Sequence, residues 1–209
     1  GQFIRQDGPT QHLTKRGTPT MGGVVIILAT VVAWLIGSLV AGAGPSWSGL
    51  LLIFLFVGLG VIGLLDDGIK IMRQRSLGLH PSGKIVGQVA VASLFAGGTL
   101  IRPNEFGELA GTLEISLARP TPLTLGFAGM AIGVILYLIW TNLIVTAWSN
   151  ATNLTDGLDG LAAGVSIFVF GAYTFIAYFQ RIQACTQPDV NRAACYSTRD
   201  PLDLAIFCA

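Results

Sequence analysis

The chain consists of long apolar runs separated by short polar segments. No charged side chain occurs between Met21 and Leu65, and one bilayer-spanning helix uses only about 20 residues of such a run. The turn residues and tryptophan of Gly44–Ser48 divide it into two spans. The same pattern along the chain predicts one transmembrane domain, residues 1–209, with spans at about 21–43, 49–65, 85–101, 123–148 and 161–179 and a partial sixth at 202–209.

The spans are expected to be helices, because lipid offers no partner for unpaired backbone groups and the strands of a membrane barrel are much shorter. Between the third and fourth spans, the alternating run Thr112–Leu117 precedes Pro120-Thr121-Pro122, which predicts a short β-hairpin at the outer face. The predicted fold class is therefore an all-α polytopic membrane protein with five complete transmembrane helices, the start of a sixth, and this hairpin.

Successive spans place the polar segments alternately on the two sides of the bilayer. Residues 1–20, 67–84 and 149–160 share one side, and they hold seven of the twelve basic residues, including every lysine. The positive-inside rule makes this side cytoplasmic. Charged residues make up only 11% of the chain and its formal net charge is +1. This composition excludes an ordinary soluble domain and a nucleic-acid surface built on bulk basicity.

The three cysteines lie near the end of the chain. Cys185 and Cys195 occupy the last outer segment, where an oxidising exterior would permit a disulfide between them. Two free thiols are an equally good interpretation. Cys208 lies in an apolar run and is expected to contribute only to packing.

The second apolar run ends in Asp66 and Asp67. Adjacent like charges, the negative end of a helix and anionic headgroups all disfavour such a pair, so a compensating cation is expected. Lys70, four residues after Asp66, is one candidate, and a divalent metal ion is another. Neighbouring residues on a helix point about 100° apart, so the two carboxylates are not expected to face one ion equally. The alternative is a solvated helix end with a simple Asp–Lys pair.

A second polar motif covers residues 150–160. Its polar side chains recur at every third position: Asn150, Asn153, Asp156 and Asp159. On one straight helix they would spread over half of the circumference, so the two glycines of the motif are expected to break the helix and let the side chains converge. Intramembrane carboxylates and amides are costly without partners, which makes these residues functional candidates. The alternative, an aspartate that caps the fifth span, does not account for the asparagines.

Two further segments are rich in groups that bind phosphate. The segment before the first span combines Lys15 with glycines and hydroxyls such as Thr20, which suits a phosphate or nucleotide contact at a helix N-terminus; an ordinary loop has similar composition. The basic residues of 70–84 suit a lipid phosphate or merely set the topology. Together, carboxylates, amides, hydroxyls and lysines on one membrane face indicate magnesium-assisted chemistry between a soluble phosphate ester and a lipid phosphate.

These motifs closely resemble those of the phospho-N-acetylmuramoyl-pentapeptide-transferase family (MraY, lipid I synthases), within the polyprenyl-phosphate N-acetylhexosamine-1-phosphate transferase superfamily. The resemblance covers essentially the whole chain. The matching text is Gly1–His12, Lys15–Gly23, Leu65–Lys70, Leu77–Leu79 with Lys84 and Gln88, and Asn150–Gly160. The resemblance implies transfer of phospho-N-acetylmuramoyl-pentapeptide from UDP-MurNAc-pentapeptide to undecaprenyl phosphate, with Mg²⁺ as cofactor and release of UMP. It also implies a homodimer in the bacterial plasma membrane, active on the cytoplasmic face.

The resemblance also implies a role for each matching residue. Asp66 and Asp67 would form the catalytic aspartate pair and are the candidate metal ligands, one of them a base toward the lipid phosphate. Lys70 would be a catalytic-centre lysine, and Asp156, beside Asn153, would lie near the sugar and diphosphate. The remaining substrate contacts, several of them around the uridine, would come from Lys15, Thr20, Lys84, Asn150, Gly157, Leu158 and Asp159.

The chain departs from the family in two respects. Ser82 stands where the family commonly has a basic residue, which puts that phosphate contact in doubt. The later cytoplasmic motifs of the family, a further metal-binding aspartate and a histidine-rich loop, would lie beyond Ala209. Since the chain also starts at Gly1 without a signal-peptide pattern, it is expected to be a fragment truncated at both ends and inactive by itself.

Three other functions compete with this interpretation. A polyprenyl-phosphate N-acetylglucosamine-1-phosphate transferase shares the aspartate pair, but Thr18–Gly23 argues against it. A CDP-alcohol phosphotransferase would have Ala-Arg after its first Asp-Gly pair, whereas Leu161-Ala162 follows Asp159-Gly160 here. A membrane transporter would place its charges near the midplane, whereas these charges lie at the ends of spans.

Overall fold

The computed structural model describes residues 22–42, 44–74, 77–104, 107–116, 120–155, 160–192, 195–196 and 199–209. Within these ranges the chain is mostly helical, which confirms the predicted all-α class. The elements are α1 (Gly22–Val40), α2 (Trp47–Met72), α3 (Pro81–Thr99), β1 (Glu114–Ser116), β2 (Pro120–Thr124), the 3₁₀ turn η2 (Leu125–Ala128), α4 (Met130–Thr155), α5 (Leu161–Ile182) and α6 (Pro201–Cys208).

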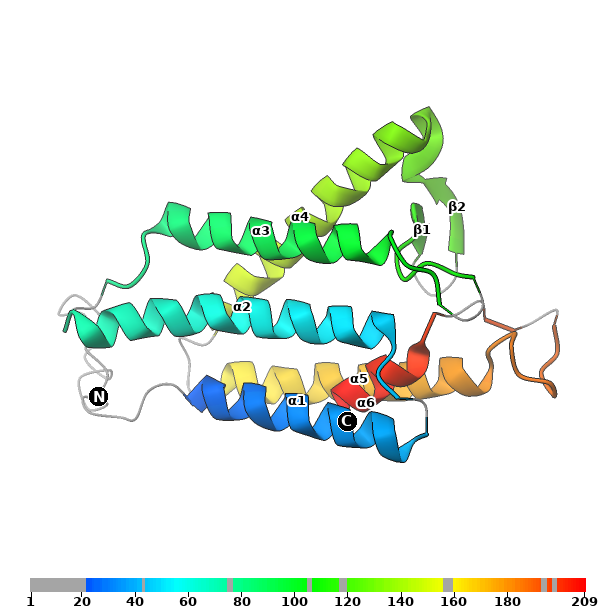
Figure 1. Cartoon of the computed structure of the whole chain (residues 1–209), viewed down its shortest axis with the longest axis horizontal. Helices are drawn as coiled ribbons and strands as arrows, with labels where there is room; N and C mark the ends of the chain where they lie inside the picture. Colours follow the sequence, from blue (N-terminus) through cyan, green and yellow to red (C-terminus); the bar gives the residue numbers. More distant parts are fainter. Residues whose placement is uncertain are drawn as a thin grey trace.

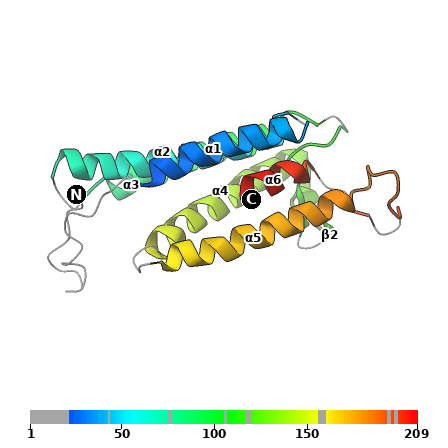
Figure 2. The ribbon, with the colours of Figure 1, turned by 90° about the horizontal axis from the view of Figure 1, so that it is seen from below.

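The helices form two layers. α1, α2 and α3 lie side by side, and α4 and α5 lie beneath them (Figures 1 and 2). α6 packs between the layers, against α5, α1 and α2. The end of α2 and the start of α3 lie at one end of the molecule, together with the end of α4 and the start of α5 (Figure 1). This arrangement matches the predicted alternation of the polar segments.

Four of the helices, α1, α2, α4 and α5, are long and apolar enough to cross a membrane. α3, predicted as the third span, is 19 residues long, the same length as α1. It is less apolar because it contains Lys84, Gln88 and several small residues. Its contacts with α2 and α4 place it between these two helices, and its Gln88 is buried, as polar side chains of transmembrane helices usually are.

Large apolar side chains cover the outside of the helices. Phe168 and Phe175 of α5 are 80% and 72% exposed, and Ile26 and Leu28 of α1 are more than half exposed. In water such a surface would drive aggregation. In a bilayer it faces lipid, so the exposed apolar faces agree with the predicted membrane class.

The predicted start of the fourth span, at residue 123, is wrong. Residues 123–124 belong to β2, and Gly129 turns the chain into α4 with a φ of 102°, a conformation that favours glycine. At the other end the amides did not stop the helix, so α4 continues through Asn150 and Asn153 to Thr155. The polar motif therefore begins on the last turns of α4.

α2 is also longer than its predicted span of 49–65. It starts after Ser46, whose side chain accepts a hydrogen bond from the backbone N–H of Gly49 at 3.0 Å. This is an N-cap, which satisfies one of the free N–H groups of the first turn. The helix runs on to Met72, so the acidic pair and its lysine lie within the last two turns of α2.

The other end of the molecule carries the remaining polar structure. β1 and β2 pair antiparallel, with Glu114 opposite Thr124, which confirms the predicted hairpin. Cys185 and Cys195 form a disulfide in the segment between α5 and α6, so the structure selects one of the two interpretations of these cysteines. Cys208 is a free thiol on α6.

Glycines bring α2 and α3 close together. A Cβ atom at Gly58 would lie 2.8 Å from Val91 Cγ1, and one at Gly98 would lie 2.6 Å from Leu51 Cδ2. In lipid, helices associate largely through van der Waals packing, because lipid tails are as apolar as the side chains. Small residues in the interface increase that contact area.

This packing predicts different effects for two glycine substitutions in α2. Gly58→Ala forces Val91 to move, whereas a Cβ at Gly63 meets nothing within 4 Å. Both substitutions gain the same helix propensity, so their difference isolates the packing. We expect Gly58→Ala to be less stable than Gly63→Ala by about 1–3 kcal/mol, measured by thermal unfolding in detergent. Equal unfolding temperatures would show that the α2–α3 contact is not tight.

Candidate active site

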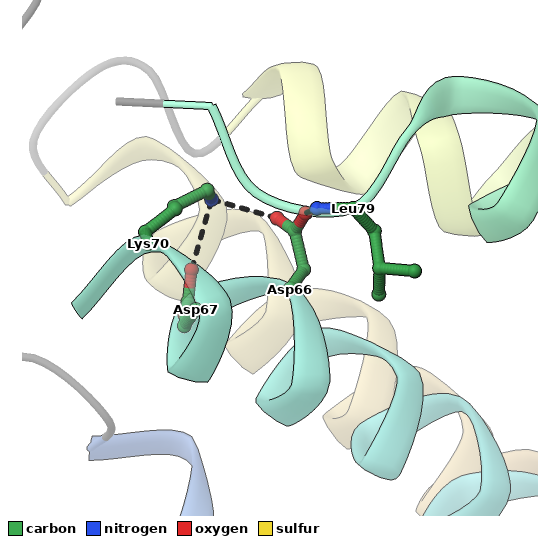
Figure 3. A network of polar contacts seen from close by, with 4 residues as sticks. All are labelled: Asp66, Asp67, Lys70 and Leu79. Carbon is green, nitrogen blue, oxygen red and sulfur yellow. Dashed lines mark hydrogen bonds and ion pairs between the residues drawn. The ribbon is translucent and has the colours of Figure 1, made fainter. Parts of the chain in front are cut away.

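Asp66 and Asp67 share one lysine near the end of α2 (Figure 3). Lys70 Nζ lies 2.6 Å from Asp66 Oδ2 and 2.9 Å from Asp67 Oδ1. The expectation that two neighbouring carboxylates cannot face one ion equally is wrong for this ammonium group. Lys70 follows Asp67 by three residues and Asp66 by four, and its side chain is long enough to reach both carboxylates. We call these three residues the acidic cluster; with two negative charges and one positive charge, it keeps a net negative charge.

The two carboxylates have different surroundings. Asp66 is 17% exposed, and its Oδ1 accepts a hydrogen bond from the backbone N–H of Leu79 at 2.8 Å. Asp67 is 49% exposed. Asp66 therefore uses one oxygen to bind the segment before α3 and the other to bind Lys70, while Asp67 lies open at the surface (Figure 3).

The contact between α2 and the segment before α3 depends on a glycine. A Cβ atom at Gly78 would collide with the carboxylate of Asp66 and lie 2.6 Å from its backbone oxygen. No side chain fits in that space without moving the segment. Gly78 therefore permits the hydrogen bond that the next residue, Leu79, donates to Asp66.

The start of α3 adds a second lysine to this region. The helix begins with Pro81, a residue suited to the first helical position because it needs no N–H partner there. Lys84 follows within the first turn, half-buried, and its charge acts on Asp66. Ser82 stands where the family that the chain resembles commonly has a basic residue. Its hydroxyl oxygen lies 2.7 Å from the ring nitrogen Nδ1 of His80.

Asn150 is tied into the protein by both amide hydrogens. Its Nδ2 donates to the backbone oxygen of Thr146 at 2.8 Å and to Oε1 of Gln88 at 3.0 Å. Any contact with a substrate would therefore use its carbonyl oxygen. Asn153, one turn further along α4, is exposed. Two residues later α4 ends, and Gly160, with a φ of 76°, caps the start of α5.

The structure thus describes six of the predicted site residues: Asp66, Asp67, Lys70, Lys84, Asn150 and Asn153. It brings the first four together at the junction of α2 and α3 and puts the two asparagines at the same end of the molecule, on α4 (Figure 1). The other predicted site residues lie outside the described residues; they are Lys15, Thr20, Asp156, Gly157, Leu158 and Asp159.

Asp67 is the carboxylate of the acidic cluster that a metal ion could reach, because the two oxygens of Asp66 already bind Leu79 and Lys70. Among the residues that the structure describes, no group of three or more His, Cys, Asp or Glu side chains comes together as a metal site. Mg²⁺ needs no such group, because it often binds one or two carboxylates and completes its shell with water and substrate phosphates. The open carboxylate of Asp67 and the net negative charge of the cluster fit this mode of binding.

Sequence reasoning missed three contributors to this region. Gly78, the backbone N–H of Leu79 and the side chain of Gln88 appear in the sequence only as part of the text that resembles the family. A glycine between two leucines marks a close approach of the backbone. Nothing local reveals that Gln88 contacts a residue 62 positions away.

The fold and the site define a class of protein, a helical polytopic membrane protein with carboxylates, amides and lysines gathered at one end of its helices. The chain belongs to glycosyl transferase family 4, because the model of that family matches residues 49–195. Residues 15–27 match a signature of phospho-N-acetylmuramoyl-pentapeptide-transferases.

Similar curated proteins carry that transferase name. The chain is 56% identical over its whole length to phospho-N-acetylmuramoyl-pentapeptide-transferase of Beutenbergia cavernae, 52% identical to that of Paenarthrobacter aurescens and 47% identical to that of Streptomyces griseus. The matched regions cover 58%, 58% and 57% of those proteins. The chain thus spans less than two thirds of the length of these relatives.

The close approach at Gly78 predicts an effect on the backbone nearby. Gly78→Ala should displace the segment before α3 and break the hydrogen bond from Leu79 to Asp66. Hydrogen bonds to charged groups contribute about 1.5–3 kcal/mol, so amide exchange at Leu79 should be at least about tenfold faster, measured by mass spectrometry of the peptide that contains residues 77–80.

Gly83→Ala is the matched control, because its Cβ meets only Leu79 Cδ2 at 3.5 Å, an ordinary contact. Its exchange at Leu79 should equal that of the wild type. Unchanged exchange in Gly78→Ala as well would show that Asp66 does not depend on this approach.

Proposed function

We propose that the complete protein transfers phospho-N-acetylmuramoyl-pentapeptide from UDP-MurNAc-pentapeptide to undecaprenyl phosphate and releases UMP. The product would be lipid I, the first membrane-bound intermediate of peptidoglycan synthesis. The observation that carries this proposal is the acidic cluster at the end of α2, a helix long and apolar enough to cross a membrane, in a chain 56% identical to a transferase of that name. The proposal concerns a full-length protein, because this chain matches only 58% of the length of that relative.

The reaction exchanges one pyrophosphate linkage for another. An oxygen of undecaprenyl phosphate attacks the phosphorus next to the sugar, the bond between the two phosphates of the UDP donor breaks, and UMP leaves with the bridging oxygen. Because the bonds formed and broken are alike, the protein does not need to supply driving force. It must align two anionic substrates and neutralise their charge.

The two aspartates would divide this work. Asp67 is the more exposed carboxylate, so it is the better candidate to meet the lipid phosphate or a metal ion. Asp66, bound to Leu79 and Lys70, would fix the local structure around it. Bound Mg²⁺, held by Asp67 with Asp66 nearby, would neutralise negative charge on the diphosphate. Lys70 and Lys84 would add two positive charges for phosphate oxygens.

The remaining predicted contacts complete the proposed donor site. Asn153 is exposed on the last turn of α4, where it is accessible to the sugar and diphosphate. We assign Asp156 to the same region and retain the predicted contacts with the uridine part of the donor, which are Lys15, Gly157, Leu158 and Asp159, with Thr20 as a neighbouring contact.

The disulfide supports a cytoplasmic location for this site. Cys185 and Cys195 lie at the opposite end of the helices from the acidic cluster (Figure 1). Disulfides persist in oxidising compartments, so that end would face the exterior and the acidic cluster the cytoplasm, where the UDP donor is made. The proposed setting is therefore the plasma membrane of a bacterium, with the homodimer that the resemblance implies.

The test uses the complete gene product in membranes, supplied with UDP-MurNAc-pentapeptide, undecaprenyl phosphate and Mg²⁺. UMP release should require Mg²⁺. Asp67→Asn and Asp156→Asn should each lower its rate by at least about 100-fold, the range expected when a group that assists proton transfer or neutralises charge is lost.

Asp189→Asn is the matched control, since Asp189 is an exposed aspartate in the outer segment between α5 and α6; its activity should be unchanged. UMP release from UDP-N-acetylglucosamine in place of the muramoyl donor would assign the protein to the sister transferases. A folded protein that releases UMP from neither donor would overturn the proposal and favour a transporter.

A further inference from the structure

Gln88 is a buried polar residue to which the proposed mechanism gives no role. It lies on α3 with 1% of its surface exposed, the largest of the fully buried side chains among the described residues. Its Nε2 donates to Ser149 Oγ at 3.0 Å, and its Oε1 accepts from Asn150 Nδ2 at 3.0 Å. Both ends of its amide therefore bind neighbouring residues of α4.

This contact is directional as well as buried. Apolar packing leaves two helices free to slide and rotate within limits, whereas a primary amide paired at both ends is satisfied in one arrangement only. An unpaired buried amide is costly, so the pairing resists displacement. The hydrogen bonds thus fix the height and rotation of the last turns of α4 against α3.

α3 connects this contact to the acidic cluster. Leu79, just before α3, donates to Asp66, and Lys84, one turn before Gln88, acts on the same carboxylate. From Leu79 to Gln88 the chain is one short segment followed by two turns of helix. A rigid element therefore binds Asp66 at one point and the asparagine motif of α4 at another.

We propose that Gln88 is a positioning residue that sets the last turns of α4, which carry Asn153, at their working distance from the acidic cluster. Asn150 acts through Gln88 and contacts no donor through its amide hydrogens. This inference rests on the proposed function, because Asn153, on those turns, is a predicted donor contact.

A second contact between the same helices provides a matched control. Asn142 Nδ2 donates to the backbone oxygen of Leu138 at 2.8 Å and to Ser93 Oγ at 3.0 Å. Asn142 thus makes the same two kinds of hydrogen bond as Asn150, but it lies two turns further from the end of α4 that carries the motif. Loss of this contact should weaken the α3–α4 packing without moving the motif.

The experiment compares Gln88→Met with Asn142→Ala in the full-length protein. Both should unfold at a lower temperature than the wild type. Gln88→Met should in addition lower kcat/KM for the UDP donor at least about tenfold, mainly through KM, since small misplacements of binding groups have large effects on rate. KM for undecaprenyl phosphate should change less. Asn142→Ala should keep kcat/KM within about twofold of the wild type.

The double variant Gln88→Met/Asn150→Ala tests whether Asn150 acts through Gln88. Residues that work as one unit are non-additive, so the double variant should be no less active than the worse single variant. Multiplied losses would show that Asn150 contacts the donor itself and would overturn that part of the inference. If Gln88→Met does not fold, Ser149→Ala takes its place, because this variant removes one of the two contacts of Gln88. The same rise in KM is expected.

Two outcomes separate this inference from the proposed function. Wild-type protein that releases no UMP would refute the function. Active wild-type protein in which Gln88→Met, or Ser149→Ala in its place, shows the same kcat/KM as Asn142→Ala would refute the positioning role alone, and Gln88 would then serve only to stabilise the bundle.

Discussion

The sharing of one ammonium group by two adjacent carboxylates is the interaction on which the candidate site depends. Lys70 bridges Asp66 and Asp67, and without a cation the pair would repel itself at the negative end of a helix. Once oriented, Asp66 binds the backbone of Leu79 and so fixes the entry into α3. Gln88, further along the same helix, binds α4. These contacts link the acidic cluster, through the start of α3, to the last turns of α4, which are distant in the sequence.

The bilayer explains why these contacts are polar or involve small residues. In water the hydrophobic effect would drive the helices together, but in lipid an exposed phenylalanine such as Phe168 incurs no penalty. Association then depends on close packing, as at Gly58 and Val91, and on hydrogen bonds between helices. The pair Ser93–Asn142 and the contacts of Gln88 both lie on the α3–α4 interface, which makes it the most directional interface of the described bundle.

Much of this architecture follows from sequence, and the failures have identifiable causes. Apolar runs and turn residues predicted the helices and the hairpin, because backbone groups in lipid allow few alternatives. The start of α4 was wrong, since apolar composition alone does not distinguish a β2 residue such as Leu123 from a helical one. Its asparagines did not end the helix, which continues to Thr155. The i, i+4 spacing identified Lys70 as partner of Asp66. The contact of Gln88 with Asn150 is tertiary, and no local pattern encodes it.

The structure also separates the roles of two chemically identical neighbours. Successive helical residues point about 100° apart, so only one of the two carboxylates can face the segment before α3. Asp66 does so and is largely enclosed, whereas Asp67 is about half exposed. Lys70 balances one of the two negative charges, and Lys84 follows in the first turn of α3. In the proposed function, a divalent cation at Asp67 would join the two lysines in neutralising the substrate phosphates.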